Sequence, residues 1–302
     1  MSIDSVKLNF SQDSLWVLNL CLAIIMFGVA LDIKVADFKK VFMAPKATIV
    51  GLLLQFLLLP AATFVLVLII QPAPSIALGM MLVAACPGGN ISNFMSHLAR
   101  ANSALSVSLT SIGTILAIFM TPFNLQLWAS LYQPTASILH DVSLDVWEVF
   151  KTIAVLIGIP LIIGMWVRQQ YPTAATQIAK RVKPFSIIIF AAFVIVAFLG
   201  NLDAFFEFIH LVILIVFVHN LAALSLGFYI AKFSKLGFEN QKTLAIETGI
   251  QNSGLGLILI FSFFDGLGGM AIVAAWWGIW HILSGLTIAT YWSRTSPITQ
   301  PA

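Results

Sequence analysis

Long apolar runs are the feature that most restricts how this sequence can fold. Nine runs of about 20 residues occur, and a helix of that length crosses the hydrocarbon core of a bilayer. Backbone polar groups cannot be left unpaired in lipid, so each run is expected to be helical rather than irregular. The runs are residues 15–31, 47–70, 75–99, 105–128, 146–167, 185–200, 208–230, 243–264 and 270–292.

The composition supports the same class of protein. Hydrophobic residues make up 60% of the 302 residues and charged residues 9%, whereas charged residues are about 25% of a soluble domain. We therefore predict an all-α polytopic membrane protein with nine transmembrane helices, surrounded by membrane lipid. Cys21 and Cys86 both lie inside apolar runs, so neither a disulfide framework nor a metal site is expected from them.

The basic residues predict the orientation of the helices. If the amino terminus is outside, the inner loops collect every Lys and Arg of the 15 except Lys7 and Lys151, including Lys180, Arg181 and Lys183 before the sixth run. Cytoplasmic loops carry such an excess. We therefore predict a multi-pass protein of the cell membrane, the inner membrane if the chain is bacterial, with a cytoplasmic carboxy terminus. The formal charge of +3 reflects this bias, and no nucleic-acid partner is expected.

The eighth run contains a charge in its middle. Glu247 lies there, with Gln251 and Asn252 between Gly249 and Gly254. An ionisable group at this depth costs roughly 2.5 to 3.5 kcal/mol on insertion scales, so it indicates a functional site. The two glycines predict half-helices joined by unwound backbone, which a membrane tolerates only beside a cavity. Since Lys and Arg occur only near the ends of the runs, the predicted partner of Glu247 is a dissolved cation.

The third run is interrupted in a similar way. Pro87, Gly88 and Gly89 precede three polar side chains about halfway across, and these residues favour an open helix. The third and eighth runs are five crossings apart and therefore have opposite directions. We predict an inverted repeat of four plus five helices, with two crossing broken helices whose breaks meet near the midplane. The alternative is that both breaks are simple kinks relieved by neighbouring helices.

Other polar residues in the apolar runs allow two interpretations. Hydroxyl side chains spaced 3, 4 and 4 residues apart share one face of the fourth helix and suggest cavity lining, although each could bond its own helix. They are Ser103, Ser106, Thr110 and Thr114. Gln55 could belong to the same site or could bond a neighbouring helix. For His210 and His219 in the seventh run we expect core packing.

Four motifs resemble those of the bile acid:sodium symporter family, and the resemblance extends over residues 14–292. They are Cys-Pro-Gly-Gly-Asn-Ile-Ser-Asn at 86–93, Leu-Ala-Arg-Ala-Asn-Ser-Ala-Leu-Ser at 98–106, Glu-Thr-Gly-Ile-Gln-Asn-Ser-Gly-Leu at 247–255 and Trp-His-Ile-Leu-Ser-Gly at 280–285. The chain is similar to the nine-helix form of that family, as in the animal bile acid carriers.

This resemblance implies two structural domains. A panel domain would comprise residues 15–31 and 146–200, that is, helices 1, 5 and 6. A core domain would comprise residues 45–128 and 208–292, that is, helices 2–4 and 7–9, with broken helices at 87–93 and 247–254.

The resemblance also implies two sodium sites that share one carboxylate. The first would consist of Ser92, Asn93, Ser106, Thr110 and Glu247. The second would consist of Gln55, Glu247 and Gln251 with the backbone carbonyls of Thr248 and Ile250. Asn90, Asn252 and His281 would face the substrate cavity, and Ile282 stands where bacterial relatives commonly carry Asn. Oxygen-only ligands suit a hard cation such as Na⁺.

The predicted function is sodium-coupled symport of an organic anion, bile-salt-like or a small carboxylate or sulfonate, by alternating access. The charges of Glu247, two Na⁺ and a monoanion sum to zero. A neutral loaded site crosses the membrane at a lower free-energy cost than a charged one. The alternative is proton coupling, with Glu247 as the protonatable group. A channel would need rings of charges or carbonyls, and an enzyme would need a nucleophile with a base or a metal motif, none of which is evident. We expect a monomer without a cofactor, with Na⁺ as the coupling ion.

Overall fold

The fold is helical throughout the part of the chain that the structure describes. The computed structural model describes residues 2–8, 12–33, 45–89, 91–142 and 145–295, and no β-strand occurs among them. The predicted all-α class is therefore confirmed. The α-helices are α1 (Gln12–Ala30), α3 (Pro45–Leu53), α4 (Leu59–Ile70), α5 (Pro74–Ala85), α6 (Ile91–Leu98), α7 (Ser103–Leu131), α8 (Gln133–Val142), α9 (Val146–Ile153), α10 (Ile159–Gln170), α11 (Pro172–Leu199), α12 (Leu202–Phe233), α13 (Phe238–Gly249), α14 (Ser253–Phe263) and α15 (Gly268–Thr295).

Five helical stretches among the described residues are long and apolar enough to cross a membrane. They are Pro45–Ile70, Ser103–Leu131, Trp147–Gln170, Leu202–Phe233 and Gly268–Thr295. Shorter apolar helices occur at Leu15–Ala30, Pro74–Ala85 and Ser253–Phe263. The last two belong to the interrupted runs. Helix α6 follows the break after Pro74–Ala85, and α13 precedes the break before Ser253–Phe263. Helix α8 between the fourth and fifth runs was not predicted, because its alternation of polar and apolar residues keeps it below the hydropathy of a spanning helix.

The helices extend beyond the apolar runs, so several basic residues expected in loops lie on helices instead. Helix α11 begins at Pro172, and Lys180, Arg181 and Lys183 are part of it. Lys242, also expected in a loop, lies on α13. Lys and Arg are good helix formers, so a helix can continue through them outside its apolar part. The apolar run thus locates the buried part of a helix but not its end.

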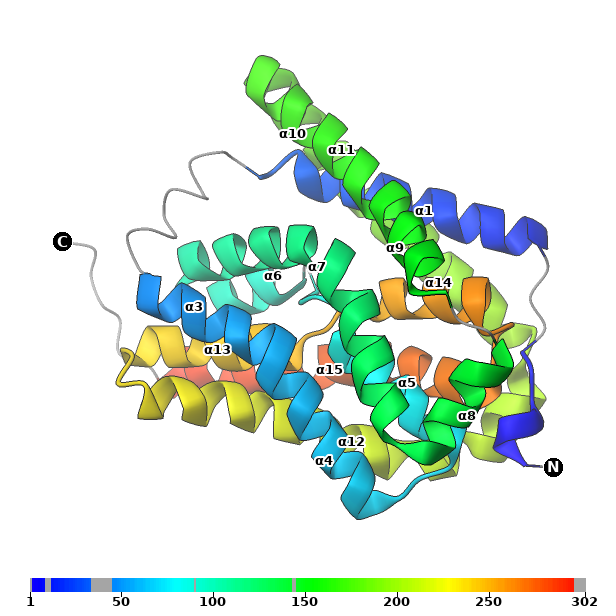
Figure 1. Cartoon of the computed structure of the whole chain (residues 1–302). Coiled ribbons are helices and arrows are strands. Elements are labelled where there is room, and N and C mark those ends of the chain that lie inside the picture. The colour runs from blue at the N-terminus through cyan, green and yellow to red at the C-terminus, as the bar shows by residue number, and fades with distance from the viewer. Residues whose placement is uncertain (1, 9–11, 34–44, 90, 143–144, 296–302) are drawn as a thin grey trace.

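The helices divide into a small group and a larger bundle (Figure 1). Helix α1 packs against α10 and α11, and these three lie along one side of the molecule. In the bundle, α12 packs on α13 and α15, and α5 lies between α15 and α7. The small group meets the bundle where α1 contacts α14, and α9, which leads into α10 through a π turn, contacts α7 of the bundle.

Two membrane-length stretches contain a π-helical turn that ends two residues before a proline, Pro60 in one and Pro160 in the other. The turns are Leu54–Leu58 in the stretch from α3 to α4 and Ala154–Gly158 in the stretch from α9 to α10. Pro60 has no N–H for the carbonyl of Phe56, which instead accepts from Nδ2 of Asn124 on α7 at 3.0 Å. The wider turn that precedes Pro60 carries Gln55.

The amino-terminal segment is attached to the ends of two helices in the bundle. The Asp4 carboxylate accepts from the backbone N–H of Ser75 at 2.8 Å, in the first turn of α5. Lys7 pairs with Asp265 at 2.8 Å, in the turn between α14 and α15. The backbone of Leu8 donates to Gly266 O at 2.9 Å. This segment therefore ties the start of α5 to the α14–α15 turn.

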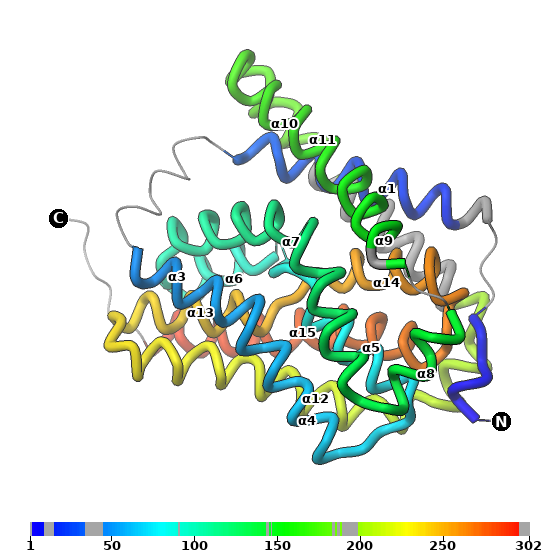
Figure 2. Tube along the Cα trace, in the orientation of Figure 1, coloured from blue at the N-terminus to red at the C-terminus, as the bar shows by residue number. Residues whose placement is uncertain are grey.

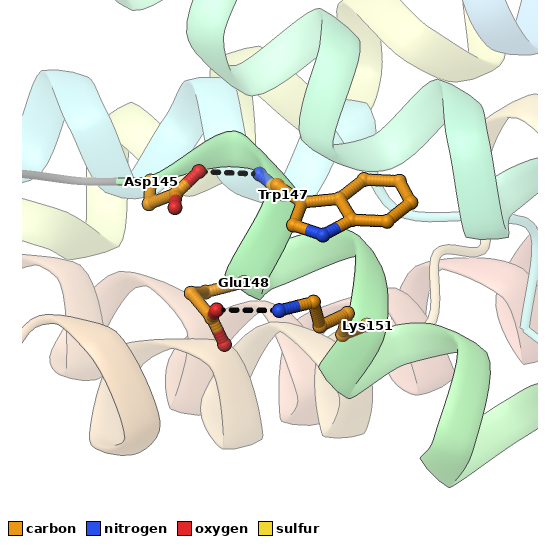
Figure 3. Close-up of polar contacts among 4 residues, drawn as sticks. All are labelled: Asp145, Trp147, Glu148 and Lys151. Carbon is orange, nitrogen blue, oxygen red and sulfur yellow. Dashed lines mark hydrogen bonds and ion pairs between the residues drawn. The ribbon is translucent and has the colours of Figure 1, made fainter.

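Helix α9 begins at a polar cap with an aromatic side chain beside it (Figure 3). The Asp145 carboxylate accepts from the backbone N–H of Trp147 at 2.8 Å, which caps the helix. Glu148 and Lys151 form an ion pair at 2.7 Å, and the Lys151 ammonium lies 5.8 Å from the centre of the Trp147 ring. Trp147 is 59% exposed. Such a combination is typical of a helix end at a membrane interface.

Candidate functional site

The two interrupted runs meet at their breaks (Figure 2). The chain leaves helical form between α5 and α6 and again between α13 and α14. The backbone N–H of Gly89 donates to Ile250 O at 2.7 Å, and that of Asn252 donates to Pro87 O at 2.9 Å. Gly88 and Gln251 form an isolated antiparallel bridge. Backbone N–H and C=O groups that have no helical partner at one break are thus hydrogen-bonded to backbone groups of the other break.

The glycines of the first break allow this close crossing. A Cβ added to Gly89 would lie 3.0 Å from the carbonyl oxygen of Gln251, which is tighter than an ordinary contact. A Cβ added to Gly88 would lie 3.3 Å from Oε2 of Glu247. Any larger residue at these positions would push the second break away. Gly88 therefore makes room for the Glu247 carboxylate, and Gly89 makes room for the backbone of Gln251.

Glu247 lies in the last turns of α13 and is 6% exposed. Its Oε1 accepts from Ser92 Oγ of α6 at 2.6 Å and also from Ser106 Oγ of α7. Its Oε2 accepts from Thr110 Oγ1 of α7 at 3.0 Å. Three hydroxyl groups from two helices thus surround one carboxylate. No ion pair links Glu247 to a Lys or Arg of the described residues.

Asn93 completes this cluster from the next position of α6. Its Oδ1 lies 2.8 Å from Ser106 Oγ and 3.3 Å from Thr110 Oγ1. Each hydroxyl has one proton, and both of these hydroxyls also approach Glu247. The cluster therefore contains more oxygen acceptors than protons to share among them. A hard cation with oxygen ligands would satisfy such a set.

A second polar cluster adjoins the first and is centred on two glutamines. Gln55 Nε2 lies 3.0 Å from Gln251 Oε1 and 2.8 Å from Cys86 O. Gln251 Nε2 lies 2.8 Å from Thr248 O. Gln55 thus bonds the neighbouring broken helices and stands beside Glu247 at the same time, because both side chains lie within 4 Å of the place where Gly88 would carry a Cβ. The bonds of Gln55 to neighbouring helices are therefore confirmed, and its membership of an ion site stays a prediction.

A small cavity lies beside both clusters, since Glu247 and Gln55 both line it. Its volume is about 10 Å³, close to the smallest that holds one water molecule. Its lining is Gly51, Leu52, Gln55, Gly88, Leu109, Gly113 and Glu247. A Cβ on Gly113 would meet nothing within 4 Å, so this glycine leaves open space toward the site.

The hydroxyl face of α7 divides between the site and its own helix. Ser106 and Thr110 approach Glu247, as described above. Thr114 donates instead to the carbonyl of Thr110 at 2.7 Å. For Thr114 the alternative interpretation therefore holds, in which the hydroxyl bonds its own helix. Ser103 begins the helix and contributes no hydrogen bond to this site within the described residues.

The residues predicted to face a substrate are placed only in part. Asn90 lies outside the described residues. Asn252 accepts from the backbone N–H of Leu255 at 3.1 Å and so caps α14. His281 is buried on α15, one turn from Gly278, where a Cβ would lie 2.7 Å from Ser253 Oγ. His281 therefore lies on the face of α15 that is packed against the second break.

The two histidines of the seventh run differ. His219 is buried, 2.7 Å from Thr63 Oγ1 and with its ring 4.6 Å from that of Trp277, so core packing is confirmed. His210 is exposed on α12, so the prediction of core packing is wrong there. The helix periodicity explains this, because nine positions move a side chain to the opposite face.

Several buried polar residues that support the breaks were not predicted. Asn220 of α12 donates to Gly249 O at 2.7 Å, and Thr121 of α7 donates to Ala85 O at 2.8 Å. Lys242 is 1% exposed. Its ammonium donates to two carbonyls of the turn that follows α6, Ala99 O at 2.8 Å and Arg100 O at 2.6 Å. For Asn220 and Thr121 the sequence signal was an amide or hydroxyl within an apolar run, the same signal that identified Gln55, whereas Lys242 lies just before its run and gave no such signal.

Comparison with known proteins identifies relatives over nearly the whole chain. Residues 19–208 match the model of the Sodium Bile acid symporter family. The chain is 35% identical over 292 residues to the Uncharacterized sodium-dependent transporter YocS of Bacillus subtilis, covering 95% of this chain and 88% of the relative.

More distant relatives are named as cotransporters. The Probable sodium/metabolite cotransporter BASS1, chloroplastic, of Arabidopsis thaliana is 26% identical, with 91% of this chain and 66% of the relative covered. The human Ileal sodium/bile acid cotransporter is 29% identical, with 79% of this chain and 67% of the relative covered. All three relatives are thus named as transporters or cotransporters.

Proposed function

Because this chain belongs to the sodium bile acid symporter family, we propose that it carries an organic anion into the cell together with sodium, by alternating access. Membership places it among membrane transporters that depend on sodium and not among enzymes. The anion, the number of sodium ions and the movement are our proposal, and the arrangement around Glu247 is the observation that carries it.

We assign the first sodium site to the cluster around Glu247. A buried carboxylate is costly in a membrane unless it is compensated. Here three hydroxyls donate to it, and the Asn93 amide oxygen accepts from two of the same hydroxyls. Each hydroxyl can also turn an oxygen lone pair toward a cation, and the amide oxygen is an acceptor already. The proposed ligands are Ser92, Asn93, Ser106, Thr110 and Glu247.

The second sodium site is assigned to the cluster around Gln55 and Gln251. Thr248 and Ile250 contribute backbone carbonyls near the end of α13, where helix carbonyls lack following N–H groups. A carbonyl oxygen has two lone pairs, so Ile250 O can accept from Gly89 N–H and still face a cation. Glu247 would serve both sites, which provides a direct electrostatic link between them.

Charge counting supports an organic anion as the third component. Glu247 and two Na⁺ leave one positive charge, which a monoanion neutralises. One net positive charge then enters per cycle, and each 100 mV of membrane potential contributes about 2.3 kcal/mol to uptake. Asn90, Asn252 and His281 are proposed to face the anion. A bile salt or a small carboxylate or sulfonate fits this scheme.

The proposed architecture has nine transmembrane segments in an inverted repeat of four plus five. Segments would be α1, α3–α4, α5–α6, α7, α9–α10, α11, α12, α13–α14 and α15. The grouping of α1 with α10 and α11 supports a panel of residues 15–31 and 146–200 that moves against the core of residues 45–128 and 208–292. We propose a monomer with its amino terminus outside and its carboxy terminus in the cytoplasm.

Uptake into liposomes tests the proposal. Purified full-length protein would be reconstituted. Uptake of a labelled bile salt, and of labelled pantoate as a small carboxylate, would be measured with an inward sodium gradient at fixed pH. A second set of liposomes would carry a pH gradient without sodium. Uptake of either anion with sodium alone, increased by an inside-negative potential, is the expected result. Uptake driven only by the pH gradient would indicate that Glu247 carries a proton.

A further inference from the structure

Asn220 connects three helices behind the second break. It lies within the apolar helix α12 and is 1% exposed. Its Nδ2 donates to the carbonyl oxygen of Gly249, the last residue of α13, at 2.7 Å. Its Oδ1 accepts from Ser284 Oγ of α15 at 2.6 Å. A carbonyl only accepts hydrogen bonds, so the NH₂ end of the amide must face Gly249, and Ser284 holds the other end.

The Gly249 carbonyl lies between the two backbone carbonyls assigned to sodium. Thr248 O accepts from Gln251 Nε2 at 2.8 Å, and Ile250 O accepts from Gly89 N–H at 2.7 Å. The helical partner of Gly249 O would be the N–H of Ser253, which instead lies 3.0 Å from Gln251 O. Three successive carbonyls are therefore each held by a different part of the fold, and Asn220 holds the central one.

The packing of α12 on α13 leaves little freedom around this contact. A Cβ added to Gly249 would lie 2.6 Å from Cγ of Leu224, one turn after Asn220. A Cβ added to Gly227, a further turn along, would lie 2.8 Å from Cα of Ala245. Asn220, Leu224 and Gly227 form one face of α12 that touches the backbone of α13. This close packing keeps the Asn220 amide opposite the Gly249 peptide.

We propose that Asn220 is a positioning residue for the second sodium site. It fixes the Gly249 peptide group, and thereby sets the directions of the Thr248 and Ile250 carbonyls on either side. Ser284 acts on the same site by orienting the Asn220 amide. Neither side chain contacts the ion. The inference rests on the proposed function, because it refines one of the two sodium sites.

A purely structural role for Asn220 makes a different prediction. If the amide only joined α12, α13 and α15, its loss would lower thermal stability and weaken both sodium sites together, or neither. A positioning role weakens the second site selectively, because the first site consists of side chains on α6 and α7 with Glu247. Separate measurement of the two sodium-binding events therefore distinguishes the roles.

Isothermal titration of sodium chloride into the purified full-length protein is the test. Asn220→Ala removes the amide, and Asn220→Asp keeps its volume without the donor. Both should lower the sodium affinity of the second binding event roughly five- to 150-fold, and Ser284→Ala should lower it about 2- to 13-fold. The affinity of the first binding event should stay within about twofold of the wild-type value. Thr135→Val is the matched control, because it removes a buried hydrogen bond to Ala129 O, outside both proposed sites. It should lower the melting temperature and leave sodium binding unchanged.

Two outcomes would overturn the inference. One is an unchanged second event in folded Asn220→Ala, and the other is equal weakening of both events. Where Asn220→Ala does not fold, Ser284→Ala decides by the same criteria. Absence of sodium binding in the wild type would instead contradict the proposed function itself, so the two failures are distinguishable.

Discussion

The two breaks cross each other but contribute different chemistry. The first, after Cys86, consists of a proline and two glycines, and its polar side chains follow on α6. The second has Glu247 before it on α13 and Gln251 within it. One break thus supplies space and neutral oxygens, whereas the other supplies the charge and the freed carbonyls. A site that holds a cation in the membrane needs both, and neither helix alone has them.

The breaks are also supported from different sides. Thr121 of α7 and Gln55 of the first π turn donate to Ala85 O and Cys86 O at the first break. Asn220 of α12, backed by Ser284 of α15, donates to Gly249 O at the second. Movement of α7 and movement of α12 should therefore act on different parts of the site. Substitutions at the two breaks should accordingly have different effects, and four predictions test this difference.

The largest effect is expected at Glu247, the one charge that the two breaks share. Glu247→Gln keeps the size of the side chain and removes the charge that we propose holds both cations. Sodium-driven uptake into liposomes should be abolished, because burying cations without a counter-charge is costly. Glu148→Gln is the control, since Glu148 is an exposed acid paired with Lys151, and it should retain uptake. Sodium-driven uptake persisting in Glu247→Gln would remove Glu247 from the mechanism.

The next largest effect is expected at Gly89, where the first break touches the second. Gly89→Ala places a methyl group 3.0 Å from Gln251 O, and backbone cannot move aside as a side chain can. The free energy of unfolding should fall by about 1 to 3 kcal/mol, and both sodium-binding events should weaken. Thermal unfolding and sodium titration would measure these changes. Gly237→Ala is the matched control, because nothing lies within 4 Å of its added Cβ. Equal behaviour of the two variants would mean that the close crossing is not needed.

Replacing one neutral ligand at each break should separate the two sites. Gln251→Ala should weaken the second site and reduce the sigmoidal dependence of uptake on sodium. Asn93→Ala should weaken the first site and, through the shared carboxylate, the second as well. Each loss should lower sodium affinity roughly five- to 150-fold. Sodium-dependence curves for both variants would show the difference. Identical curves would contradict separate sites.

The smallest effect is expected at Lys242, which holds the end of α6 without touching the site. Its ammonium bonds Ala99 O and Arg100 O, and α6 carries Ser92 and Asn93. Lys242→Met should lower sodium affinity at the first site by about 2- to 13-fold, and Lys242→Arg should restore most of it. Lys232→Met, at an exposed position near the end of α12, is the control. Changes confined to the second site would show that α6 is held by other contacts.

Much of this arrangement was predictable because it depends on local sequence. The apolar runs predicted the helices, and the proline and glycines predicted both interruptions. Helical spacing placed Ser106 and Thr110 on one face, and Glu247 was evident as a charge in an apolar run. For the identities of the two sodium sites, however, the resemblance to a family was needed, and their assignment remains our proposal.

The rest depends on contacts between distant parts of the chain, which no local pattern encodes. Lys242 bonds a carbonyl 143 residues away, and Asn220 bonds one 29 residues away. The π turn before Pro60 depends on Asn124 from another helix to pair the Phe56 carbonyl. The start of α11 was missed for a different reason, since hydropathy detects burial in lipid and not the helical backbone beyond it.

Sodium titration at fixed pH tests the central claim, that the crossing breaks form a sodium site around Glu247. Isothermal titration of sodium chloride into purified wild-type protein, without any organic anion, should give saturable binding with a Hill coefficient above one and not above two. The same titration of Glu247→Gln should give no binding. A single non-cooperative event in the wild type, or binding that persists unchanged in Glu247→Gln, would contradict the account.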